Sequence, residues 1–164
     1  MKKYINKKVL SETSLYYGDV KLPSDWKIDR DQILVHEVYA DIKRENFMSC
    51  KPFDMLNTYV IEHSYVEYGL AIQNMENWGT EYNPLETSKP FCHVNYDDVL
   101  KSPDYILLYG VRVEDCTVRI KYKQNKYLDR QWNISLENNK FIMFPSSCMY
   151  YIENKQKEKS NFIH

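Results

Sequence analysis

The chain has 164 residues, of which 43% are hydrophobic, and a formal net charge of −1. This length allows one domain with a real core, the apolar content excludes global disorder, and the small net charge excludes a general attraction to nucleic acid. Fifteen tyrosines and only four glycines favour half-buried pleated surfaces. We therefore expect a single domain over residues 1–164 with a mainly β core.

The cysteines and the N-terminus indicate a reducing compartment. No zinc-type spacing connects the cysteines, and no apolar leader follows Met1, so a disulfide framework is not expected. No stretch is long and apolar enough to predict a membrane span. We expect a soluble, cytoplasmic protein whose cysteines are small buried hydrophobes: Cys50, Cys92, Cys116 and Cys148.

The first 58 residues are expected to support the core as helical and irregular structure. Residues 27–45 predict an N-terminal helix, because Leu34, Val38 and Ile42 recur every four residues along one face. The polar residues before this helix are expected to be irregular, and residues 46–58 to form a connector.

Residues 59–164 are expected to form a β-barrel core. Residues 59–75 are rich in Val, Ile and Tyr, which favours one or two strands, whereas residues 76–92 are interrupted by prolines and predict a loop. Short strands and turns then alternate at the spacing typical of a sandwich or barrel. A further strand begins near residue 161, so we expect the last strand to be truncated. The strands predicted before it are 105–113, 116–123, 131–136, 140–144 and 150–152.

Three short segments stand in a distinctive order in the second half of the chain. They are FCHVN at residues 91–95, YILLY at 105–109 and KFIMFPSS at 140–147. This order resembles the Fe(II)/2-oxoglutarate-dependent oxygenases, in particular the prolyl-hydroxylase-like branch of viruses and bacteria, over about residues 75–164. The resemblance implies a mainly β (α+β) fold: a double-stranded β-helix of the jelly-roll or cupin type, here with an N-terminal helix.

The resemblance also implies where a metal centre would lie. In such oxygenases two imidazoles and one carboxylate occupy one face of Fe(II) and leave three positions for 2-oxoglutarate and oxygen. The first histidine position holds His93, the carboxylate position Asn95 and the distal histidine position Tyr150. A neutral amide and a phenol are weaker ligands, so the implied site is degenerate. Asp97 stays open as a substitute carboxylate, and His164 as a second imidazole.

The co-substrate positions are eroded as well. The resemblance implies a basic side chain late in the barrel that binds the carboxylate of 2-oxoglutarate. The matching positions fall near Lys157, Lys159 and Ser160, with no arginine there, and Tyr109 is the further residue expected to line the pocket. Fe(II) and 2-oxoglutarate are the implied cofactors if the chain is active, and none is implied if it is not.

Three functions stay open on the sequence. The chain is a binding module with an impaired iron site, an active 2-oxoglutarate-dependent hydroxylase with a rearranged centre, or a jelly-roll structural protein of viral type. A small-molecule or peptide ligand and a homo-oligomer fit these readings, and the host cytoplasm is the expected location if the chain is viral. Arg119, Lys121 and Lys123 share one face of a predicted strand, which we interpret as a solvated face and not a nucleic-acid site.

Overall fold

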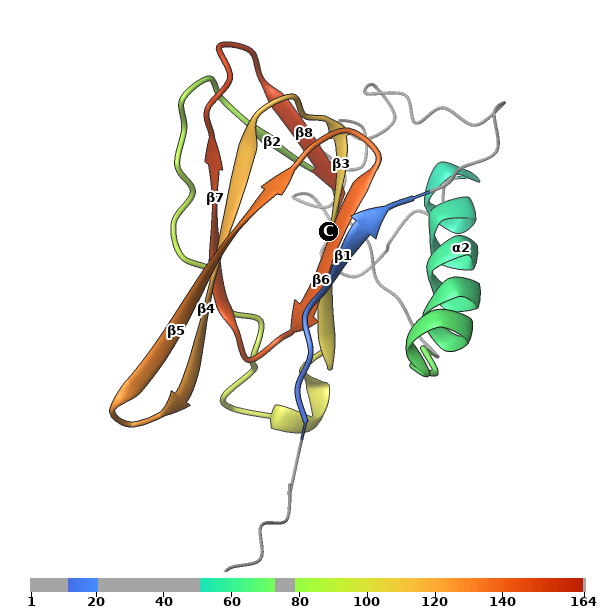
Figure 1. Cartoon of the computed structure of the whole chain (residues 1–164), viewed down its shortest axis with the longest axis vertical. Coiled ribbons are helices and arrows are strands. Elements are labelled where there is room, and N and C mark those ends of the chain that lie inside the picture. The colour runs from blue at the N-terminus through green and yellow to red at the C-terminus, as the bar shows by residue number, and fades with distance from the viewer. Residues whose placement is uncertain (1–11, 21–50, 73–78, 164) are drawn as a thin grey trace, which may run out of the picture.

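Two antiparallel β-sheets packed face to face form the body of the molecule (Figure 1). The structure is a computed structural model that describes residues 12–20, 51–72 and 79–163. One sheet has five strands in the order β1-β6-β3-β8-β2, and the other has three in the order β5-β4-β7. The elements are β1 (Tyr16–Asp19), α2 (Lys51–Tyr68), β2 (Gly79–Tyr82), the 3-10 helix η1 (Val99–Lys101), β3 (Tyr105–Arg112), β4 (Cys116–Asn125), β5 (Leu128–Leu136), β6 (Lys140–Pro145), β7 (Met149–Asn154) and β8 (Ser160–Ile163).

The chain passes back and forth between the two sheets. β3, β6 and β8 lie in the five-stranded sheet, whereas β4, β5 and β7 lie in the three-stranded one. The segment between β2 and β3 lies against β7 through two isolated bridges, Thr87 with Glu153 and Phe91 with Tyr150. This antiparallel crossing pattern is that of a cupin-like β-sandwich and confirms the predicted mainly β fold. The helix predicted over residues 27–45 lies outside the described residues.

The main core fills the space between the sheets. Along β4, Cys116, Val118 and Ile120 are buried and the residues between them are more exposed. This alternation is expected of a strand with one face on the core and the other toward solvent. Phe144 of β6 and Tyr150 of β7 face this layer and are completely buried. The strands predicted from 105 to 152 are confirmed, with shifts of a few residues at their ends.

A second apolar layer covers the outer face of the five-stranded sheet. Leu56 and Val60 of α2 pack there with Tyr109, Phe141 and Met143 of β3 and β6. Figure 1 shows α2 lying beside the β1 edge of this sheet. Within the described residues, no helix is long and apolar enough to cross a membrane.

The prediction of a connector followed by strands at 59–75 is wrong where the structure describes the chain. Lys51–Tyr68 is one helix, and its buried positions Leu56, Val60 and Ser64 recur every four residues. The Val, Ile and Tyr residues that suggested a strand lie largely on the exposed sides of the helix, as Val66 does. At such positions the lower helix propensity of these residue types costs only tenths of a kcal/mol per residue, which does not prevent a helix.

Residues that commonly start and end helices stand at the two ends of α2. Pro52 stands in the first turn, where a backbone N–H is not needed for the helical hydrogen bonds. Gly69 adopts φ 68° after the last helical residue, and its N–H donates to the Tyr65 carbonyl at 3.1 Å. The sequence therefore carried the stop signal, although the segment before it suggested a strand.

Two strands lie where the sequence predicted irregular structure. β1 comes from the polar N-terminal region and pairs with β6, and β2 comes from the predicted loop at 76–92 and pairs with β8. Both are four-residue strands at the two edges of the five-stranded sheet. Such short edge strands form because a neighbouring strand offers its backbone, and four residues are too few to show a reliable period.

Gly110 on β3 allows a close approach of the β5–β6 turn. Its carbonyl accepts the N–H of Asn139 at 2.9 Å, and a Cβ added at Gly110 would overlap the carbonyl oxygen of Glu137.

We expect Gly110→Ala to lower the free energy of unfolding by about 1–3 kcal/mol, because the backbone of the β5–β6 turn must move to make room for the methyl group. Urea unfolding measures this. Gly18→Ala is the matched control, since its nearest neighbour, Phe141 Cε1, lies at 3.6 Å; equal losses in the two variants would contradict the prediction.

Candidate functional site

The fold brings His93 and Tyr150 into direct contact although they are 57 positions apart in the sequence. Phe91 and Tyr150 exchange backbone hydrogen bonds, with N···O distances of 2.7 and 3.0 Å. This bridge fixes the strand-like segment that leads to His93 against the start of β7. His93 Nε2 then lies 3.0 Å from the Tyr150 hydroxyl oxygen, within hydrogen-bond distance.

The pair is held in an aromatic, water-poor setting. Tyr150 is fully buried, with the Phe144 ring edge-on at 5.1 Å and the Phe91 ring at 5.6 Å between centroids. Burial raises the pKa of the Tyr150 phenol well above its ordinary value. Burial also lowers the pKa of the half-buried His93 imidazole. Both groups are therefore neutral near pH 7, and the His93 tautomer decides which one donates.

Asn95, at the carboxylate position of the motif, organises the loop after His93. Its side-chain oxygen accepts the backbone N–H groups of Asp97 and Asp98 at 3.0 and 3.1 Å. Its own N–H donates to Ser102 Oγ at 2.8 Å, on the far side of η1. Asn95 is exposed, and its amide acts here as a turn-forming group.

Of the other polar candidates, the acidic and basic side chains lie on the surface and Ser160 is buried. Asp97 is exposed in the same loop, and Lys157 is exposed between β7 and β8. Lys159 forms an ion pair with Glu81, which ties the β7–β8 connection to β2. Ser160 is buried, with its Oγ at 3.6 Å from Cys116 Sγ. His164 lies outside the described residues.

Tyr109 stands on the opposite face of the five-stranded sheet from the interior that holds Tyr150. Side chains alternate along β3, so Leu108 faces the core between the sheets while Tyr109 faces α2. The Tyr109 hydroxyl donates to Asn139 Oδ1 at 2.7 Å, and burial raises the pKa of this phenol. The structure thus separates Tyr109 from the His93–Tyr150 pair.

The side chains at the three positions that the resemblance implies for metal ligands do not match the donor set of an Fe(II) triad. They are one half-buried imidazole, one amide oxygen that already accepts two N–H groups, and one phenol that burial keeps neutral. Such a centre calls for two imidazoles and a carboxylate on one face of the metal. Across the described ranges, no three His, Cys, Asp or Glu side chains converge in a way that could hold a metal ion.

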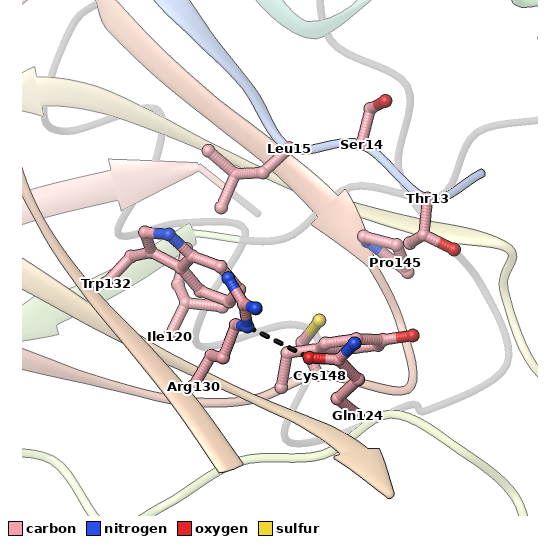
Figure 2. Close-up of a pocket in the computed structure, with 10 residues that line it drawn as sticks. Thr13, Ser14, Leu15, Ile120, Gln124, Arg130, Trp132, Pro145 and Cys148 are labelled. Carbon is pink, nitrogen blue, oxygen red and sulfur yellow. Dashed lines mark hydrogen bonds between the residues drawn. The ribbon is translucent and has the colours of Figure 1, made fainter. Parts of the chain in front are cut away.

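Sequence reasoning missed a cavity at the base of the β4–β5 hairpin. Its volume is about 260 Å³, and Figure 2 shows side chains from three parts of the chain around it. The alternation of Tyr122 and Gln124 on β4, and of Arg130 and Trp132 on β5, could have suggested a shared face. Only the pairing register brings the two sets together.

No protein-family model and no curated protein matches the chain. A solved structure of a Pseudomonas putida prolyl-4-hydroxylase is similar, with a TM-score of 0.57 and 10% identity over 92% of this chain and 82% of that chain. Two Drosophila melanogaster structures, the CENP-C cupin domain and CENP-C bound to CAL1, each give a TM-score of 0.42 and 10% identity over 53% of this chain. The chain covers 56% and 60% of those two chains, less than two thirds of their length. The hydroxylase comparison shows an oxygenase-like fold.

We expect Tyr150→Phe to lower the free energy of unfolding by about 1 kcal/mol, because it keeps the buried ring and removes the hydroxyl that bonds to His93. Thermal or urea unfolding of the purified variant measures the loss. Tyr127→Phe is the control, since this residue is 85% exposed at the hairpin tip. A Tyr150→Phe protein as stable as the control would show that the contact contributes nothing.

The stability of the fold should depend on pH through His93. Its pKa in the folded chain lies below the ordinary 6.5, so the unfolded chain binds a proton that the folded chain resists. The His93 contribution is complete above about pH 6.5 and is lost as the pH falls toward the lower folded-state pKa. Urea unfolding of wild type and His93→Gln between pH 7.5 and 5 measures the difference, those pH values bracketing the ordinary histidine range. Identical pH slopes for the two proteins would contradict the expectation.

Proposed function

We propose that the chain is a binding module on an oxygenase-like fold and has lost iron-dependent hydroxylation. The contact between His93 Nε2 and the Tyr150 hydroxyl carries this proposal. At the position where the resemblance places the second imidazole, a buried phenol bonds to the first imidazole instead. The pair supports the interior of the sandwich, and its contact occupies Nε2 of the imidazole.

The cost of rebuilding a metal centre from these groups supports the proposal. Tyr150 would have to lose its proton inside an apolar core, and burial raises its pKa further from neutrality. The His93 imidazole would have to break its contact with that phenol. Asn95 would have to release two backbone N–H groups of its loop. The first two changes leave a charged or unpaired polar group in or near the core, and an unpaired buried polar group costs about 1–3 kcal/mol. The third removes two hydrogen bonds from the exposed turn after His93.

A small molecule or a peptide is the ligand class that we propose for the module. The loop after His93 and the hairpin arm lie at the same end of the sandwich, because Tyr150 and Met149 at the start of β7 pair with Ile120 and Lys121 of β4. Side chains that are not committed to the core are therefore available at this end, as in many folds that carry binding sites at one rim.

Titration of the purified chain with Mn(II), a redox-stable substitute for Fe(II), tests the loss of the metal centre. We expect calorimetry to show no micromolar binding, because only one of the three ligand positions holds a side chain suited to the metal. His93→Ala is the control. Micromolar affinity in wild type that disappears in His93→Ala would overturn the proposal.

Turnover provides a second measurement. With Fe(II), ascorbate and 2-oxoglutarate, we expect no succinate above the level of the His93→Ala protein. Succinate formation that requires His93 would instead favour a hydroxylase with a rearranged centre.

A further inference from the structure

The cavity at the hairpin base is a built concavity outside the His93–Tyr150 pair. β7 pairs with β4 only from Cys116 to Lys121, so the rest of the β4–β5 hairpin extends as a two-stranded arm (Figure 1). The N-terminal segment that leads into β1 and the β6–β7 turn close the other sides of the cavity. Its volume of about 260 Å³ lies just below the range of about 300–1,000 Å³ that is typical of small-molecule pockets.

The walls of this cavity are apolar and aromatic. Ile120 belongs to the core between the sheets, and Leu15 packs against the same core from the N-terminal segment. Tyr122 and Trp132 stand beside each other with ring centroids 6.5 Å apart. Trp132 lines the hollow and is 40% exposed, so part of its side chain is open to contact from outside the fold.

A guanidinium group stands at the mouth. The register places Arg130 opposite Tyr122, and Trp132 opposite Ile120, so these four side chains share the inner face of the arm. Arg130 Nε donates to Gln124 Oε1 at 3.0 Å, as Figure 2 shows. This bond holds the plane of the guanidinium through Nε, and the two terminal nitrogens extend beyond it.

Arg130 differs in its partners from the other arginines of the sandwich. Arg112 is paired with Glu158 at 2.9 Å and Arg119 with Glu153 at 2.6 Å. In the described part of the chain, no carboxylate lies within ion-pair distance of Arg130. The cavity therefore combines a positioned cation that lacks a counter-charge with an aromatic wall.

We propose that this cavity binds a small organic carboxylate with a planar or apolar body. The carboxylate would meet the Arg130 guanidinium, whose fork matches two carboxylate oxygens, and the body would lie against Trp132 and Leu15. The proposal extends the binding function proposed above, because it names a ligand class for that function, and it rests on the chain being a binding module. The site itself uses neither His93 nor a metal.

Titration of the ¹⁵N-labelled full chain with phenylacetate tests the proposal. We expect saturable shifts of the Trp132 indole N–H signal, which Trp132→Phe assigns. Phenylacetamide keeps the ring and removes the charge, and acetate keeps the charge and removes the ring. Each should bind at least about tenfold more weakly, since one charge-assisted pair or one stacked ring is worth that much.

Arg130→Gln should weaken phenylacetate binding at least about tenfold. Lys123→Gln is the matched control, because it removes one positive charge from the exposed outer face of the same hairpin and should leave binding unchanged. Circular dichroism of both variants reports whether the sandwich is intact. Equal binding by the two variants, equal binding of phenylacetate and phenylacetamide, or no saturable shift in the wild type would overturn the proposal.

The two proposals fail separately. The phenylacetate titration contains no metal, so micromolar Mn(II) binding would overturn the loss of iron chemistry and leave the cavity standing. A chain that binds neither phenylacetate nor Mn(II) would lose this ligand class while the absence of the iron centre stands.

Discussion

The burial of Tyr150 between the two sheets is the constraint on which the rest of this structure depends. The ring fills the interior beside Phe144, while its backbone pairs with β4 on one side and with Phe91 on the other. One residue therefore joins the core, the three-stranded sheet and the segment that carries His93. A smaller side chain at this fully buried position would leave a void in the core, and voids of that kind cost stability in proportion to their volume. The ring of Tyr150 thus stabilises the sandwich, and the same burial keeps its phenol neutral near pH 7.

The two ends of the sandwich are built differently. At the end where β7 finishes, the buried Asn154 donates to the carbonyls of Asn83 and Glu158 at 2.7 and 3.1 Å, and Gln156 accepts the N–H of Glu114 at 2.7 Å. These amides join three connections into one satisfied network, which makes that end rigid. At the other end, where β7 begins, the hairpin arm and the loop after His93 extend past the sheets. The cavity beside Trp132 and the exposed aromatic residues Tyr96 and Tyr127 lie at this second end.

The elements that the sequence predicted are those defined by a local pattern of apolar residues. The elements that it missed are defined by pairing or packing against distant parts of the chain. β3 to β7 are long enough for apolar alternation or a continuous apolar run to show, and turns such as that at Asn138 and Asn139 separate them. α2 was mistaken for strands because its β-branched and aromatic residues are typical of sheets, whereas its helical state follows from one buried stripe against Phe141 and Met143. β1 and β2 exist through pairing with distant strands, which no local pattern contains. Local propensity competes with tertiary packing, and it loses where the segment is short or its buried face is narrow.

The His93–Tyr150 pair and the hairpin cavity differ in the same way, in how much of each depends on the pairing of distant strands. The resemblance placed His93 and Tyr150 at two positions of one expected site, and the structure brings these two side chains within hydrogen-bond distance. Tyr109 lay in an equally suggestive motif but points to the helix side, because an odd or even position on β3 decides the face. The hairpin cavity depends on register alone: shifting β5 by one residue relative to β4 would turn Arg130 and Trp132 to the outer face beside Lys121 and Lys123. A sequence shows which residue types are present, but the pairing of strands decides whether their side chains lie together. For Arg130 and Trp132, that pairing places a cation and an aromatic ring at the mouth of one cavity.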